Sequence, residues 1–111
     1  MIYTLDEIKQ IVSPIAQNFN IKTIYLFGSY ARNEATDTSD IDLIIDRAET
    51  EIKSLFQLAE VYCELEKAFN KKIDVITLDS IYQSIQMPSE KYFRENVFNE
   101  MISIYKEGSA N

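Results

Sequence analysis

The sequence predicts a small α+β domain, a two-layer α/β sandwich. Three short segments rich in β-branched and aromatic residues alternate with segments of helical periodicity, at 23–27, 40–46 and 72–77. The 111 residues fit one domain, and 46% of them are apolar, enough for a small core. We expect the domain to cover 1–107, with a C-terminal tail at 108–111.

The composition excludes several classes of protein. The chain has no His, so a Ser-His-Asp triad or a His-ligated zinc or haem site cannot form within it. Its one Cys excludes an intrachain disulfide, and no apolar run is long enough to span a membrane, so we expect a cytoplasmic protein without membrane contact. The net charge of −7 argues against direct binding of nucleic acid, which needs a basic surface.

The first helix is predicted to begin after Thr4. Thr4 and Glu7 form a capping-box pattern, and apolar residues then recur at helical spacing as far as Phe19. Pro14 falls inside this pattern, so we expect either a kinked helix or a second short helix capped by Ser13.

The strand at 23–27 is predicted to end at Gly28-Ser29, followed by a short helix over 30–34. The strand at 40–46 alternates acidic and aliphatic residues in its first half. The clearest helix covers 51–69, and its expected apolar stripe consists of Ile52, Leu55, Phe56, Ala59, Tyr62, Cys63 and Phe69, widened by Leu58 and Leu65.

Two further predictions concern the second half of the chain. Cys63, in the stripe of the long helix, is predicted to be a small core residue. After the strand at 72–77, Ser89 is predicted to cap a last helix that ends near Gly108. The apolar residues of that helix would be Phe93, Val97, Phe98, Met101, Ile104 and Tyr105.

Three aspartates are the first candidates for chemistry. Asp40 and Asp42 are two residues apart on a predicted strand, so both carboxylates point to one face, roughly 6.5–7 Å apart at Cα. Asp74 joins them if its strand is a neighbour. Like charges this close repel each other unless a cation lies between them. The ligands are oxygens only, which favours Mg²⁺ or Mn²⁺ over zinc.

The turn at Gly28-Ser29 is a candidate phosphate site. Gly permits close approach of the backbone, the Ser hydroxyl donates, and free N–H groups at a helix start attract phosphate. Three residues on, Arg32 is a candidate to bind phosphate oxygens over the same turn; the alternative is an ordinary surface arginine.

Together these motifs resemble the signature of the DNA polymerase β nucleotidyltransferase superfamily, and within it the minimal nucleotidyltransferase (MNT) proteins. The matching segments are 27–35 and 39–43, with Asp74 on a later strand. The resemblance implies the polymerase-β-like fold, with a small mixed sheet of three to four strands and helices packed on one face. Asn33 stands where the family usually has Gly, but Asn tolerates positive φ and we expect the turn to be kept.

The resemblance also implies roles for these residues. The three aspartates would be catalytic and would hold two metal ions, Mg²⁺ or Mn²⁺: Asp40, Asp42 and Asp74. The triphosphate of the substrate, most simply ATP, would be bound by Gly28, Ser29 and Arg32.

MNT proteins resemble the antitoxins of HEPN/MNT toxin–antitoxin pairs. The leading hypothesis is therefore a protein adenylyltransferase that transfers AMP to a tyrosine of a partner HEPN ribonuclease and silences it. Two alternatives are open: a non-catalytic antitoxin that acts by binding, and nucleotidyl transfer to a small-molecule hydroxyl. A homo-oligomer or a hetero-oligomer is compatible with each of these three hypotheses. The predicted partner contacts are Tyr82, Ile85, Met87 and Tyr92.

Overall fold

A four-stranded mixed sheet forms the centre of the molecule in the computed structural model, which describes residues 2–48, 50, 52, 54–83 and 99–107. The sheet order is β3-β2-β1-β4, and only β2 and β3 run parallel to each other. The strands are β1 (Thr23–Phe27), β2 (Ile41–Asp46), β3 (Ile73–Thr77) and β4 (Ile102–Lys106).

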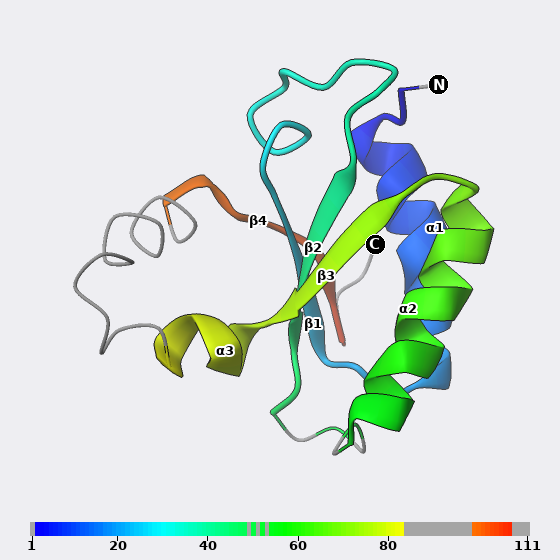
Figure 1. Cartoon of the computed structure of the whole chain (residues 1–111), viewed down its shortest axis with the longest axis vertical. Helices are drawn as coiled ribbons and strands as arrows, with labels where there is room; N and C mark the ends of the chain where they lie inside the picture. Colours follow the sequence, from blue (N-terminus) through cyan, green and yellow to red (C-terminus); the bar gives the residue numbers. More distant parts are fainter. Residues whose placement is uncertain (1, 49, 51, 53, 84–98, 108–111) are drawn as a thin grey trace.

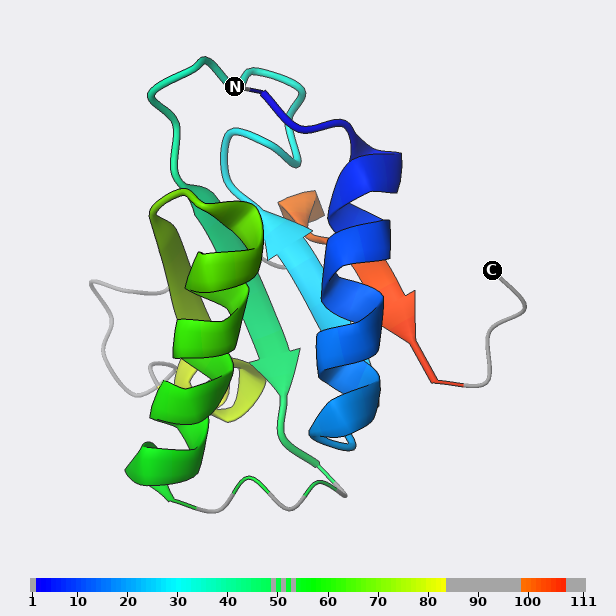
Figure 2. The same cartoon turned by 90° about the vertical axis from the view of Figure 1, so that its right-hand side faces the viewer.

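Helices α1 (Leu5–Asn18) and α2 (Leu55–Phe69) lie side by side on one face of the sheet (Figure 2). The main core lies between these helices and the sheet. The short helix α3 (Leu78–Gln83) packs on the opposite face, around Ile44 and Ile81 (Figure 1). The two-layer α/β fold is confirmed, with α3 as an addition on the second face. No helix in the described ranges is long and apolar enough to cross a membrane.

Helix α1 begins at the predicted capping box. The Thr4 Oγ1 atom accepts from the Glu7 amide at 3.1 Å, and the Thr4 amide donates to Glu7 Oε1 at 2.8 Å. The helix continues through Pro14 as one element, so the alternative of two short helices is wrong. Ser13 does not cap a second helix, because its hydroxyl donates to the Lys9 carbonyl of the preceding turn at 2.6 Å.

Helix α2 turns a different face to the core from the one we predicted. Ser54 caps it, so the helix begins at Leu55 rather than at 51. The buried residues are Val61, Leu65 and Phe69. The predicted stripe is partly wrong, because Leu55 and Phe56 are 81% and 84% exposed and Ala59 and Cys63 are exposed as well. The helix has two apolar stripes, and periodicity alone does not decide which one meets the sheet.

Strand β4 replaces the second half of the predicted last helix. Ile102–Lys106 pairs antiparallel with β1, and Ile104 is buried against the main core. The alternation of Ile, Ser, Ile and Tyr fits a strand that covers the free edge of β1. Phe93, Val97, Phe98 and the Gly108 stop lie outside the described residues, as do the contact predictions at Ile85, Met87 and Tyr92 and the side chain of Tyr82.

Two leucines of α2 can be used to test which face of the helix packs against the core. Leu65→Ala removes a side chain that is 0% exposed, and we expect it to lower the free energy of unfolding by ~2–5 kcal/mol. Leu55→Ala changes a side chain that is 81% exposed, and we expect a change within ~0.5 kcal/mol. Urea denaturation measures both. Equal losses for the two variants would show that the predicted stripe faces the core after all.

Candidate active site

The register of the sheet brings two of the three aspartates together. Asp42 lies opposite Phe27 in the antiparallel β1–β2 pair and beside Asp74 in the parallel β2–β3 pair. Residues paired in this way point to the same face of a sheet, so the two carboxylates are neighbours. From the sequence, Asp74 was expected to join the other aspartates only if its strand lay beside theirs. The parallel pairing of β2 with β3 meets this condition. The site lies where β1 ends and where β2 and β3 begin, at the top of Figure 1.

Asp42 is the most perturbed carboxyl among the described residues. Its pKa is raised from 3.8 to about 6. Partial burial is the largest cause, followed by the charge of Asp74, a hydrogen bond with Asp74 and the charge of Asp40, while Arg32 acts in the opposite direction. The ionised form of Asp42 is therefore disfavoured by its surroundings, as expected where acidic groups are gathered to bind a cation.

Gly28 makes room for this carboxyl. Its φ angle is +76°, in the region that favours glycine. A β-carbon at this position would overlap Asp42 Oδ2 and lie 3.2 Å from Asp42 Cγ. The turn that ends β1 thus lies directly against the aspartate of β2, and only a residue without a side chain fits between them.

The segment after Gly28 is a series of turns, so the predicted short helix over 30–34 is wrong. The Arg32 amide donates to the Gly28 carbonyl at 3.1 Å, and the Glu34 amide donates to the Ser29 carbonyl at 2.8 Å. Asn33 has a φ angle of +59°, which bears out the expectation that Asn keeps the turn. Any phosphate bound at Gly28 and Ser29 meets this turn rather than the N-terminus of a helix.

Arg32 is held over the turn by two glutamates. Its Nε donates to Glu34 Oε2 at 3.1 Å, and its Nη1 donates to Glu100 Oε2 at 3.0 Å. These hydrogen bonds, first that of Glu34 and then that of Glu100, raise the pKa of the guanidinium further. Glu100 lies 68 residues away in the chain, just before β4, so no local pattern in the sequence indicates this contact.

The oxygen ligands fit a hard divalent cation. In the described part of the chain, no three acidic, His or Cys side chains already enclose a position for a metal ion. Asp40 lies at the start of β2, where its Oδ2 atom is 3.9 Å from Lys72 Nζ, a contact too exposed to stabilise much. A cation between Asp42 and Asp74 would relieve the repulsion that raises the Asp42 pKa. Asp42 and Asp74 would hold such a cation, and Asp40, whose charge also raises the Asp42 pKa, is the third acidic group near it.

Comparison with known families places the chain among nucleotidyltransferases. The family model described as "Polymerase beta, Nucleotidyltransferase" matches residues 9–109. A Methanocaldococcus jannaschii protein named "Putative protein adenylyltransferase MJ0435" is 35% identical over 100 residues, covering 90% of this chain and 97% of its own. The "Protein adenylyltransferase MntA" of Thermococcus cleftensis is 33% identical over 86 residues, covering 74% of this chain and 85% of its own.

Two solved complexes contain a chain of the same fold. One is a toxin–antitoxin structure with AMP-PNP, with a TM-score of 0.66 and 19% identity over 90% of this chain and 74% of the other. The second is tri-AMPylated Shewanella oneidensis HEPN toxin in complex with MNT antitoxin, with a TM-score of 0.55 and 19% identity over 92% of this chain and 69% of the other. At this level of identity the similarity shows the fold.

Gly28→Ala tests the close approach of the turn to Asp42. The substitution adds a side chain at positive φ and against the Asp42 carboxyl, so we expect ~1–3 kcal/mol of destabilisation. Chemical denaturation measures the loss. A variant as stable as the wild type would show that the turn does not lie against Asp42 as described.

Asp42→Asn tests the repulsion within the site. A carboxyl with a raised pKa in the folded state stabilises the fold when protonated, and that contribution is lost as pH rises through about 6. In EDTA we therefore expect Asp42→Asn to raise the thermal midpoint at neutral pH, with the gain shrinking as pH falls toward 3.8. Asp46→Asn, at the far end of β2 opposite Thr23, is the matched control and should give no such gain. An Asp42→Asn protein less stable than the wild type at neutral pH contradicts the account.

Proposed function

The chain belongs to the DNA polymerase β nucleotidyltransferase superfamily, as one of its minimal nucleotidyltransferases, and we propose that it is an antitoxin that transfers AMP from ATP to a tyrosine hydroxyl of a HEPN toxin. The observation that carries the proposal is the pairing of Asp42 with Asp74 against the turn at Gly28. The names of the relatives support a protein acceptor, and the toxin–antitoxin complexes of the same fold support a toxin as partner.

Three aspartates would bind the metal. Asp40, Asp42 and Asp74 together supply enough carboxylate oxygens for two Mg²⁺ ions, and Mn²⁺ accepts the same ligands. Bound there, the cations would offset the charge of the phosphates and make an acceptor hydroxyl more acidic. No His is required for this chemistry, and the chain has none.

The nucleotide would be bound by Gly28, Ser29 and Arg32. Gly28 lets the backbone approach the phosphates, and Ser29 offers its hydroxyl. Among the described residues, the hydrogen bonds of Arg32 use Nε and Nη1, so Nη2 would be the nitrogen that donates to phosphate oxygens. Glu34 and Glu100 fix the orientation of the guanidinium through these hydrogen bonds.

The transfer is a single displacement at the α-phosphorus of ATP. The tyrosine oxygen forms a bond to the α-phosphorus, and the bond from that phosphorus to the oxygen bridging to the β-phosphorus breaks. Pyrophosphate leaves with the electron pair, and the hydroxyl proton passes to a carboxylate of the site.

The openness of the site favours a protein as acceptor. Asp74 is exposed, and Asp40 and Asp42 are only partly buried at the edge of the sheet. A small-molecule acceptor usually binds in a concave pocket that buries most of its surface. An exposed edge instead admits a tyrosine that a partner protein presents, so the partner supplies much of the recognition of the acceptor.

Intact mass spectrometry of a co-expressed HEPN partner tests the proposal. With wild-type protein, ATP and Mg²⁺, we expect the partner to gain the mass of AMP on one or more tyrosines. Asp42→Asn should reduce the transfer by at least ~100-fold, because it removes a ligand from the metal site. Asp46→Asn, on the same strand but at its opposite end, should transfer AMP normally.

The alternatives give different results in the same experiment. An unmodified partner that is nevertheless inhibited by the wild-type protein indicates inhibition by binding alone. Equal modification by the wild type and Asp42→Asn would show that the aspartate pair is not the catalytic site.

A further inference from the structure

The outward face of α2 exposes an apolar surface that the proposed function does not use. Phe56 is 84% exposed, and Ala59 and Cys63, three and seven residues further on, are exposed on the same side of the helix. Single exposed apolar residues are common, but a row of them at helical spacing indicates an interaction surface.

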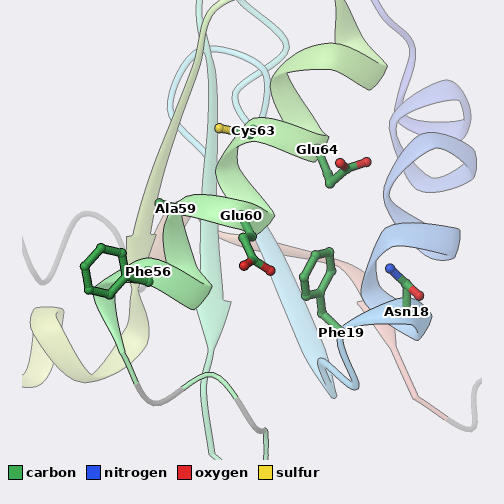
Figure 3. Close-up of a pocket in the computed structure, with 7 residues that line it drawn as sticks. All are labelled: Asn18, Phe19, Phe56, Ala59, Glu60, Cys63 and Glu64. Atoms are coloured by element: carbon green, nitrogen blue, oxygen red, sulfur yellow. The ribbon is translucent and has the colours of Figure 1, made fainter.

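A groove of about 540 Å³ runs along this face and reaches the C-terminal end of α1. We call it the α2 groove, and its lining residues are Asn18, Phe19, Phe56, Ala59, Glu60, Cys63 and Glu64. Figure 3 shows Glu60 and Glu64 projecting on the side of α2 that faces Phe19, whereas Phe56 projects on the other side of the helix. Glu60 thus lies between the two aromatic side chains, and Glu64 lies one turn further along α2.

The charged side chains that line the α2 groove are all acidic. Glu60 and Glu64 belong to a chain of net charge −7, and neither has an ion-pair partner among the described residues. A ligand that covers the aromatic rings must therefore also approach two acidic groups. A segment that carries basic side chains next to apolar ones on one face of a helix matches this arrangement.

A second copy of the chain matches the groove less well. It would bring its own Glu60 and Glu64 and its own net charge of −7 to the contact. Repulsion between like charges across an interface disfavours that pairing.

The α2 groove shares no residue with the aspartate site. The first turns of α2, which carry Phe56, follow the end of β2, whereas Asp42 and Asp74 lie near the starts of β2 and β3 (Figure 1). The two regions also lie on opposite faces of the sheet, because the buried residues of β2 that face α2 alternate with Asp42. A protein bound in the groove would leave the reaction site open.

We propose that the α2 groove binds a basic amphipathic helix of the toxin partner and anchors it away from the tyrosine that receives AMP. The inference rests on the proposed function for the identity of the partner. The anchor would keep the partner bound through successive transfers, since it does not involve the residues that hold the nucleotide.

Neighbouring residues on α2 provide a matched pair of variants. Phe56→Glu places a charge in the groove, and Leu55→Glu makes the same change at an equally exposed position that does not line it. Both lie in the first turn of α2, where Glu is favourable, so both variants should fold. We expect Phe56→Glu to weaken binding of the HEPN partner roughly tenfold or more, measured by calorimetry without ATP, and Leu55→Glu to bind like the wild type.

The contribution of charge to binding can be tested at Glu60 and Glu64. Replacing both Glu60 and Glu64 with Lys should weaken the complex and reduce the loss of affinity that added salt causes. The inference is overturned if Phe56→Glu binds as tightly as the wild type, if the Lys variant binds more tightly, or if the wild-type protein does not bind the partner. It is also overturned if sedimentation shows a wild-type dimer that Phe56→Glu dissociates, because the occupant is then a second copy.

Cys63 offers a measurement that needs no substitution in the groove. It is the one Cys of the chain and is exposed, so N-ethylmaleimide should modify it in the free protein. A bound partner should slow this modification at least ~10-fold, since it covers the groove, whereas ATP and Mg²⁺ alone should not. Unchanged modification in the complex contradicts the proposal.

These results separate the groove from the enzyme activity. A partner that receives AMP but binds Phe56→Glu normally refutes the groove and leaves the activity standing. A partner that needs Phe56 for binding but is never modified refutes the activity and leaves the groove standing.

Discussion

Two like-charged carboxylates, Asp42 and Asp74, lie side by side on neighbouring parallel strands. Parallel strands cannot be joined by a tight turn, so the contact requires α2 as a crossover between β2 and β3. The cost is visible in the pKa of Asp42, raised to about 6. At ~1.4 kcal/mol per pKa unit this amounts to at most ~3 kcal/mol, and solvent screening of a partly exposed group reduces it.

The other face of the same strands offsets this cost. Ile41, Leu43 and Ile45 of β2 are all fully buried beneath the helices. Burial of each such side chain contributes ~1.5–3 kcal/mol, so three of them exceed the penalty at Asp42. The alternation of a strand thus lets one segment carry both the core and the acidic pair, and Gly28 provides the space in which the carboxyl of Asp42 lies.

Much of this arrangement could be predicted from local sequence. The capping box at Thr4, the three strands and the spacing of Asp40 and Asp42 are short-range signals, and the tolerance of Asn33 for positive φ was predictable from its side chain. The face of α2 that packs on the sheet could not be predicted, because the helix has two apolar stripes and only contact with the sheet selects one of them. Strand β4 depends on the free edge of β1, and the contact of Glu100 with Arg32 joins residues 68 apart. The alternation at 102–105 also fits a strand, but the local sequence does not show that β1 offers it a free edge, and no local pattern indicates the contact of Glu100 with Arg32.

We propose that Asp42 and Asp74, with the turn at Gly28, form one site for metal and nucleotide. A crystal structure with Mn²⁺ and a non-hydrolysable ATP analogue, with data collected at a wavelength where manganese scatters anomalously, tests it most directly. We expect anomalous peaks within coordination distance of Asp42 and Asp74, with phosphate oxygens at Gly28 and Ser29. A nucleotide bound elsewhere, with the two aspartates still in contact and no manganese between them, would contradict the account.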